Sequence, residues 1–184
     1  MCSWLNKLGA KVYGIGHSPN KNKNLFYKLN LDKKIKLKLF DIRDFKKLNS
    51  FINASKPSII FHLAAQPIIY ESYKNPLYTF DVNFRGTLNI LEVTKNKNFI
   101  KSLVSITSDK CYENKENKSS YHEDSPMGGH DIYSSSKGAA EILISSWRRS
   151  FFSEPDSEQM KVLVASCRAG NVIGGGDWSP YRIL

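Results

Sequence analysis

Five side chains near the middle of the chain have the types and spacing needed to move protons on a sugar hydroxyl. They are Ser108, Asp109, Lys110, Tyr133 and Lys137. Tyr133 and Lys137 are four residues apart, which on a helix places them on one face, one turn from each other. An ammonium about 4 Å from the phenol would favour the tyrosinate by roughly 4 kcal/mol at an effective dielectric of about 20. Ser108 would then hold the hydroxyl that Tyr133 deprotonates.

The spacing of Tyr133 and Lys137 is weak support by itself, because many surface helices carry such a pair. The neighbouring sequence strengthens the interpretation. An apolar run over residues 99–106 predicts a buried strand that ends directly before Thr107 and Ser108, and the helix with Tyr133 follows it. Apolar runs alternate with helical periods along the chain, which predicts a doubly wound parallel α/β sheet of the Rossmann type. In such sheets ligands bind at the carboxyl ends of the strands.

The predicted elements alternate between strands and helices. Strands are expected at residues 10–15, 35–40, 58–63, 100–106 and 162–166. Helices are expected at residues 3–8, 44–54, 76–94 and 133–152, with a helical turn in the polar segment 20–30, a loop at 114–130 and a turn at 153–157. No internal repeat or linker interrupts this order. One Rossmann-type domain over residues 1–184 is therefore expected, without a complete second domain.

Charge and cysteine content exclude several classes of protein. The 184 residues include 27 Lys+Arg and 17 Asp+Glu, a net charge of +10, but much of the excess precedes residue 50 among asparagines. A solvated face therefore explains the charge better than a nucleic-acid site does, although a positive field would favour an anionic ligand. Cys2, Cys111 and Cys167 fit reduced thiols, and His122 and His130 lack metal-ligand spacing. No stretch predicts a membrane span or a signal peptide, so we expect a cytoplasmic protein that binds neither metal nor membrane.

Five segments together point to one family: FHLAAQP (61–67), VNFRGTLNILE (82–92), TSDKCYEN (107–114), PMGGHDIYSSSKGAAE (126–141) and RAGNVIGGGDW (168–178). They resemble the extended short-chain dehydrogenase/reductases that modify nucleotide sugars, which implies that residues 1–184 form a partial NAD-binding domain carrying the catalytic residues. Lys110 with Cys111, and the GGGDW run, resemble the 4,6-dehydratase branch that acts on CDP-linked glucose. The resemblance implies NAD as cofactor, a nucleotide-sugar as substrate, and a role in bacterial surface polysaccharide such as the lipopolysaccharide O-antigen.

The resemblance also implies a role for each of the five central side chains. Tyr133 would take the proton of the sugar 4-hydroxyl while NAD+ accepts hydride, Lys137 would lower the tyrosine pKa and hold the nicotinamide ribose, and Ser108 would orient the hydroxyl. Asp109 would be the acid that protonates the departing 6-hydroxyl, and Lys110 the base that removes the proton at carbon 5. The alternative for this last pair is an ordinary surface salt bridge.

Further binding residues follow from the same resemblance. The cofactor would be bound by Asp41, Ile42, Leu63, Ala64, Ala65, Gln66, Tyr133 and Lys137. The substrate would be bound by Asn83, Arg168, Asn171 and Arg182. Asp41 or Asp44 could equally be a helix N-cap, and Asn83 could be purely structural. No carboxylate follows the strand at 10–15, where His17 stands, so NAD rather than NADP rests on the resemblance alone.

The chain resembles only part of a family member. Family sequences begin with a strand and a glycine-rich turn, whereas this chain opens inside the first helix and stops where the substrate lobe would begin. We therefore expect a sheet without its first strand, with Val12 and residues 59–63 exposed. Three functions compete: a 4,6-dehydratase, a 4-epimerase that would not need the acid and base pair, and an inactive NAD-binding remnant. A homodimer through the helices at 76–94 and 133–152 is expected by analogy.

Overall fold

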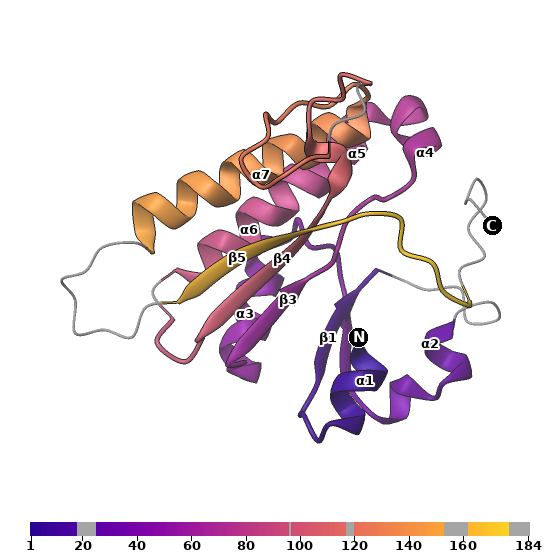
Figure 1. Ribbon diagram of the computed structural model, residues 1–184. Coiled ribbons are helices and arrows are strands. Elements are labelled where there is room, and N and C mark those ends of the chain that lie inside the picture. Colours follow the sequence, from indigo (N-terminus) through magenta and orange to yellow (C-terminus); the bar gives the residue numbers. More distant parts are fainter. Residues whose placement is uncertain (18–24, 96, 117–119, 153–161, 177–184) are drawn as a thin grey trace.

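The computed structural model of the chain describes residues 1–17, 25–95, 97–116, 120–152 and 162–176 (Figure 1). Five parallel strands in these ranges form two sheets. The strands are β1 (Tyr13–Gly16), β2 (Lys36–Leu39), β3 (Ile59–His62), β4 (Ser102–Ser108) and β5 (Leu163–Ala169). β1 pairs with β2, while the second sheet has the order β3-β4-β5. This arrangement confirms the predicted α/β class.

Helices alternate with these strands. The α-helices are α1 (Cys2–Lys7), α2 (Leu25–Lys28), α3 (Phe45–Ser55), α4 (Ile69–Lys74), α5 (Pro76–Phe80), α6 (Gly86–Thr94) and α7 (Ile132–Phe151). The shorter helical segments are η1 (Leu31–Lys33), η2 (Asp81–Arg85) and η3 (Asp109–Cys111). Figure 1 shows α3, α6 and α7 behind the three-stranded sheet, with α5 beside α7 at one end. None of the helices in the described ranges is long and apolar enough to cross a membrane.

The core fills the space between the three-stranded sheet and α3, α6 and α7. Side chains alternate between the two faces of a strand, so Ile60, Leu103 and Val164 point toward the helices and are buried. The complete cluster is Ile42, Leu48, Ile52, Ile60, Ile90, Leu91, Val93, Ile100, Leu103, Ile144, Val162 and Val164. The helices that cover this face therefore fix the position of the strands below the candidate site.

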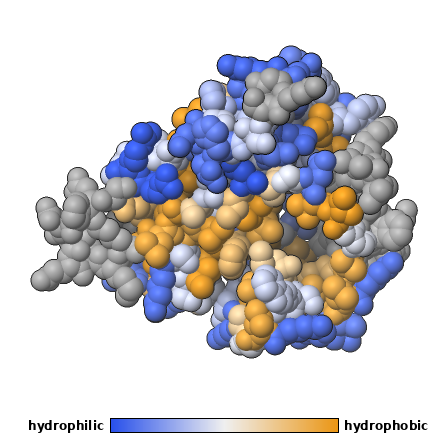
Figure 2. Space-filling model, in the orientation of Figure 1, coloured by the Kyte–Doolittle hydropathy of each residue, from blue (hydrophilic) through white to orange (hydrophobic). Residues whose placement is uncertain are grey.

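The opposite face of the same sheet is open. Ile59, Leu63 and Leu163 are 52%, 51% and 73% exposed. Figure 2 shows apolar residues gathered across this face. In the described residues no hydrogen-bonded ladder joins β1 to β3. The expected exposure is thus confirmed at residues 59 and 63, but Ile60 and His62 are buried, and Phe61 and Val12 are half-buried.

Several predicted boundaries are wrong. Residues 76–94 do not form one regular helix, because the π-helical segment η2 lies between α5 and α6. Helix α4 was not predicted, and β1 begins three residues later than residue 10. The last two strands extend further than predicted, so β4 includes Ser108 and β5 includes Arg168. The predicted turn at 153–157 lies outside the described residues.

Candidate active site

Ser108 is the last residue of β4 and is 6% exposed. Its hydroxyl donates to Asp109 Oδ1 at 3.1 Å and accepts from the backbone N–H of Lys110 at 3.2 Å. The second bond caps η3, so the chain leaves the strand directly after the serine. The serine hydroxyl is therefore held at the carboxyl end of the sheet, where parallel sheets bind ligands.

Asp109 and Lys110 lie on the first turn after this strand. Consecutive residues of a regular strand point to opposite faces, but in η3 the two side chains converge, with Lys110 Nζ 3.6 Å from Asp109 Oδ1. Asp109 also lies close to Gly170, just beyond β5. A Cβ added to that glycine would be 3.8 Å from Asp109 Oδ2. The side chains of Asp109 and Lys110 remain 49% and 33% exposed. They therefore lie at the exposed edge of the candidate site.

Helix α7 carries Tyr133 and Lys137 in its first turns, and both are buried. Asp131 caps this helix by accepting the backbone N–H of Ser134 at 3.0 Å. Burial lowers the pKa of Lys137 to about 8, and the nearby carboxylate of Glu141 opposes that shift. Within the described ranges the ammonium makes no hydrogen bond and no ion pair. It is a buried donor group available to a ligand.

Asn83 connects the end of β3 to α7. It lies in the π-helical segment and is 2% exposed. Its Oδ1 accepts the backbone N–H of Gln66 at 2.8 Å, and its Nδ2 donates to the carbonyl of Gln66 at 3.2 Å and to Ser136 Oγ at 2.9 Å. Gln66 in turn donates to Thr79 at 2.7 Å. These bonds fix the backbone at residue 66, while Leu63 and Ala64 remain exposed.

The loop before α7 packs directly on the helix because Gly138 has no side chain. A Cβ at this position would lie 2.4 Å from the carbonyl oxygen of Gly128. The same loop is tied to η3, since the Gly128 N–H donates to the carbonyl of Cys111 at 2.8 Å. The segment after η3 is therefore held against the helix at the residue that follows Lys137.

The residues predicted to meet the adenine are engaged within the fold. Asp41 accepts from the Arg43 guanidinium at 2.7 Å, and Arg43 also pairs with Asp81 at 2.8 Å. The Arg43 hydrogen bond is the main cause that lowers the pKa of Asp41 to about 2. Asp44, not Asp41, is the N-cap of α3, so that alternative for Asp41 is wrong. Ile42 is buried in the core.

The predicted substrate residues are not gathered in one place. Arg168 lies within β5 rather than after it, and its guanidinium pairs with Glu141 at 3.0 Å. It also donates to the Tyr112 hydroxyl at 2.9 Å and to the Glu123 carbonyl at 2.7 Å. Asn171 is exposed beyond the end of β5. Arg182 lies outside the described residues.

Sequence reasoning missed Glu141, which is 4% exposed and forms the centre of this polar cluster. The available signal was its spacing, because Glu141 follows Lys137 by four residues and therefore lies on the same helix face. His62, expected to belong to the fold, is buried and hydrogen-bonded to Thr87 Oγ1 at 3.0 Å. Desolvation, with a smaller contribution from the charge of Lys137, lowers the pKa of His62 to about 4.

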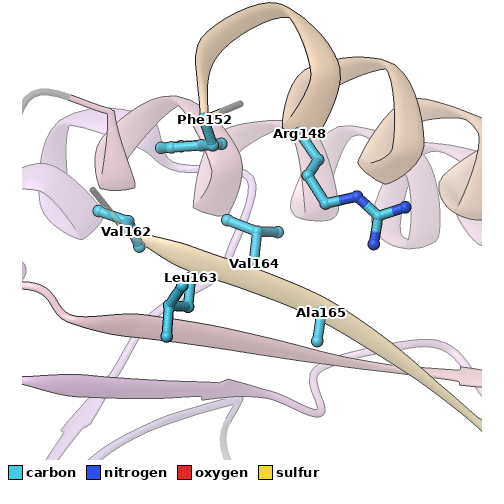
Figure 3. Close-up of a pocket in the computed structure, with 6 residues that line it drawn as sticks. All are labelled: Arg148, Phe152, Val162, Leu163, Val164 and Ala165. Atoms are coloured by element: carbon cyan, nitrogen blue, oxygen red, sulfur yellow. The ribbon is translucent and has the colours of Figure 1, made fainter. Parts of the chain in front are cut away.

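A hollow lies between α7 and β5, at the end of the three-stranded sheet opposite Ser108. Figure 3 shows Phe152, Val162 and Val164 facing one another between α7 and β5, with Arg148 along the helix and Leu163 and Ala165 on the other side of the strand. β5 begins at Leu163 beside Ser102, whereas Ser108 pairs with Ala169 at the other end. Among the residues that the structure describes, those lining this hollow include no acid and no nucleophile. The candidate active site is therefore the carboxyl end of the sheet.

A parallel α/β sheet with a serine at one strand end and a Tyr-x-x-x-Lys helix beside it is typical of nucleotide-sugar dehydrogenase/reductase folds. Residues 1–154 match the sequence model of the family described as GDP-mannose 4,6 dehydratase, and the chain belongs to this family. The chain is 46% identical to the CDP-glucose 4,6-dehydratase of Salmonella typhimurium over 181 residues, which are 98% of this chain and 50% of that protein.

Solved structures show the same fold at lower identity. The UDP-glucose 4-epimerase of Thermus thermophilus in complex with NAD aligns with a TM-score of 0.72 and 22% identity, over 90% of this chain and 49% of that one. The dTDP-glucose 4,6-dehydratase of Bacillus anthracis in complex with NAD aligns with a TM-score of 0.69 and 20% identity, over the same shares. The chain therefore spans about half the length of the relatives it matches.

Proposed function

We propose that this chain forms the cofactor-binding and proton-transfer part of a nucleotide-sugar 4,6-dehydratase that acts on CDP-glucose. The observation that carries the proposal is the convergence of Asp109 and Lys110 beside Ser108, next to the helix of Tyr133 and Lys137. A 4-epimerase needs the serine, tyrosine and lysine but has no step that requires this acid and base pair. The 46% identity to a CDP-glucose 4,6-dehydratase supports the same substrate.

The residues fit the proposed cofactor, NAD. Lys137 presents a buried ammonium without a partner in the described ranges, which suits the hydroxyls of a ribose. Leu63 and Ala64 are exposed after β3, and the small alanine side chain permits close approach to the backbone. Ala65 and Gln66 follow directly and complete the proposed cofactor-binding segment, residues 63–66. When bound, NAD supplies an acceptor for hydride from carbon 4 and a donor of hydride to carbon 6.

The proposed proton chemistry begins on the 4-hydroxyl. The proton at carbon 5 of a hexose is not acidic, but a ketone at carbon 4 makes it removable. Tyr133 takes the 4-hydroxyl proton, and the positive charge of Lys137 stabilises the phenolate. With the Lys137 pKa at about 8, the ammonium remains mostly protonated at neutral pH. Ser108 exchanges its hydrogen bond to Asp109 for one to the sugar hydroxyl.

The second half of the proposed reaction uses the converging pair. Lys110, as the neutral amine, removes the proton at carbon 5 and returns it to that carbon once carbon 6 has been reduced. Asp109, as the protonated acid, gives a proton to the departing 6-hydroxyl. The net change is the loss of one water from the sugar, so the reaction needs no external oxidant or reductant. Each role requires the less common protonation state at neutral pH, which burial under substrate and the remainder of the protein would favour.

Other residues are proposed to contact the nucleotide diphosphate or to support the site indirectly. Asn171, exposed just beyond β5, and Arg182 remain proposed substrate contacts by family resemblance. Arg168 is already committed to Glu141 and Tyr112, so its proposed contribution is to hold the wall of the site. Asn83 is proposed to act in the same indirect way, by fixing the backbone of Gln66.

The proposed assembly is a homodimer through α5 and α7. These helices contact each other, and each presents a large apolar side chain to the surface: Leu77 is 86% and Ile142 is 60% exposed. Burying both in a helix bundle would remove apolar surface from water. Size-exclusion chromatography with light scattering on the full-length protein tests this assembly, and a dimer that becomes monomeric in the double variant Leu77→Glu, Ile142→Glu is the expected result.

Incubation of the full-length protein with CDP-glucose and NAD+, followed by mass spectrometry, tests the function. A product that has lost water supports a dehydratase, an isomer of the substrate indicates an epimerase, and absence of both turnover and NAD binding indicates a remnant. In Asp109→Asn we expect dehydration to stall while partial reduction of NAD persists, measured by absorbance. Asp124→Asn, at an exposed loop carboxylate, is the matched control. Equal loss of both half-reactions in Asp109→Asn would contradict the assigned role.

A further inference from the structure

Glu141 is a buried carboxylate whose partners come from both neighbouring strands. Its Oε1 accepts the hydroxyl of Thr107 on β4. Its Oε2 accepts the hydroxyl of Ser166 and the guanidinium of Arg168 on β5, each at 3.0 Å. A buried charge is costly unless it is paired and hydrogen-bonded, and here both oxygens are satisfied. The carboxylate therefore fastens α7 to the ends of two strands at once.

These partners stand next to the residues of the candidate site. Thr107 directly precedes Ser108, and Glu141 lies one helical turn beyond Lys137 on the face that also carries Tyr133. A displacement of Thr107 along its strand would move the serine hydroxyl by a similar amount. Glu141 thus controls the spacing between the serine strand and the tyrosine helix.

The second oxygen extends this control to the wall of the site. Arg168 lies with its guanidinium 5.0 Å from the centre of the Tyr112 ring, and Tyr112 stacks on Tyr121 at 4.9 Å with an interplanar angle of 4°. Arg168 also donates to the Glu123 carbonyl. The loop after η3 is therefore held in place through Arg168, which itself is held by Glu141.

The negative charge of Glu141 also acts on the neighbouring titratable groups. It raises the pKa of Lys137 against the lowering caused by burial, and it raises the pKa of the Cys111 thiol on η3, where burial is the largest cause. On the other side, the charge of Lys137 lowers the pKa of His62 on β3. Arg168 on β5 is the remaining charged group that faces the carboxylate.

We propose that Glu141 is a positioning residue of the active site: its carboxylate holds Thr107 and Arg168 so that Ser108 keeps its place beside Tyr133 and Lys137. This inference rests on the proposed dehydratase function. The carboxylate does not touch the reacting sugar. It sets the distance across which Ser108 and Tyr133 share one hydroxyl, and it keeps the lysine beside the tyrosine charged.

Two variants of the full-length protein separate position from charge. Glu141→Asp keeps the charge but shortens the side chain, so it cannot reach both strands; a misplacement of about 1 Å lowers kcat roughly 10²-fold, with KM for CDP-glucose changed less than about threefold. Glu141→Gln keeps the shape, because its amide group can donate to the Thr107 hydroxyl while its carbonyl accepts from Ser166 and Arg168. Its kcat at pH 7 is expected within about tenfold of the wild type.

The pH profile gives the second readout. In Glu141→Gln the lysine loses the neighbouring negative charge, so the ammonium deprotonates at lower pH. The ratio of kcat at pH 9 to kcat at pH 7 is expected to fall roughly fivefold below that of the wild type, which corresponds to lowering the Lys137 pKa by about one unit from about 8. Glu92→Gln is the matched control, since Glu92 is a partly exposed carboxylate paired with Lys95 at 3.0 Å.

NMR provides a readout that does not need substrate. In protein labelled with 13C-lysine, the titration midpoint of Lys137 is expected to move to lower pH in Glu141→Gln but not in Glu92→Gln, and the amide signals of Thr107 and Ser108 are expected to shift in Glu141→Asp. Wild-type kcat, pH profile and amide signals in both Glu141 variants would overturn the proposal. If the wild-type protein fails to dehydrate CDP-glucose but the NMR changes occur, the proposed function is wrong and the positioning role stands.

Discussion

The two faces of the three-stranded sheet differ sharply although they belong to the same strands. On the face covered by α3, α6 and α7, Ile60, Leu103 and Val164 are buried. On the other face, Ile59 and Leu163, their immediate neighbours in sequence, are more than half exposed. Because side chains alternate along a strand, one element supplies both surfaces.

This difference indicates which face of the sheet holds the described part of the chain together. Within the described ranges, the hydrogen bonds by which Asn83 and Glu141 hold α7 lie on the covered side. The covered face thus carries both the core packing and these hydrogen bonds, and substitutions on the two faces are expected to have unequal effects.

The largest expected effect is chemical and comes from Tyr133→Phe. Without the phenolic oxygen the proposed base is lost, so kcat for water release from CDP-glucose by the full-length protein is expected to fall by roughly 10³-fold. Mass spectrometry of the product measures it. Tyr73→Phe, at an exposed tyrosine of α4, is expected to leave the rate unchanged. An undiminished rate in Tyr133→Phe would remove the basis of the proposed mechanism.

Next in size is the loss of core packing in Leu103→Ala. Leu103 is fully buried at the centre of the covered face. Its truncation is expected to lower the free energy of unfolding of the full-length protein by about 3 to 4 kcal/mol, measured by urea denaturation. Leu163→Ala, the same change at an exposed position on the other face, is expected to cost less than about 1 kcal/mol where that face is open. Equal losses would mean that both faces are buried in the complete protein.

These contrasts are only partly readable from the sequence. Apolar runs or alternation located the five strands of the described ranges, and helical spacing of apolar residues located α3 and α6, because burial on one side leaves a pattern in consecutive residues. Helix α4, with the sequence IYESYK, has no comparable period and was missed. The π-helical segment was also missed, since its cause includes the bonds of Asn83 to Gln66 and Ser136, residues distant in sequence.

The candidate site likewise has one part that local sequence predicts and one part that it does not. The proximity of Tyr133 to Lys137 is local and follows from helix geometry, and Ser108 follows from the end of an apolar run. The pairing of Glu141 with Arg168 joins residues 27 apart on two different elements, so no local pattern predicts it. For that reason sequence reasoning treated Arg168 as a substrate contact, whereas its described contacts lie within the fold.

The third prediction concerns pH and the buried His62 at the end of β3. Its pKa is about 4 in the folded protein against about 6.5 when exposed, so the unfolded chain binds the proton first as the pH falls. The free energy of unfolding is therefore expected to decrease between pH 6.5 and 4, by about 3 kcal/mol from this group. Urea denaturation at a series of pH values measures the slope. In His62→Gln that part of the slope should be absent, and its persistence would assign the slope to other groups.

The smallest predicted effect tests the edge of the covered face. Asp44 caps α3 by accepting the backbone N–H of Lys47 at 3.1 Å. Asp44→Ala is expected to lower the free energy of unfolding by about 1 kcal/mol, because that N–H loses its partner. Asp32→Ala, which removes a carboxylate in η1, serves as the control and should change stability by less than about 0.5 kcal/mol. Indistinguishable values for the two variants would exclude a capping contribution.

The π-helical segment between α5 and α6 divides residues 76–94 into two helical registers. A π turn holds one residue more than an α turn, and each residue of an α-helix advances the face by about 100°. Tolerance to substitution along this stretch should therefore follow one periodicity up to Phe80 and another, offset by about 100°, from Gly86 onward. Deleting a single residue within the segment would bring the two registers into phase and turn Asn83 away from Ser136.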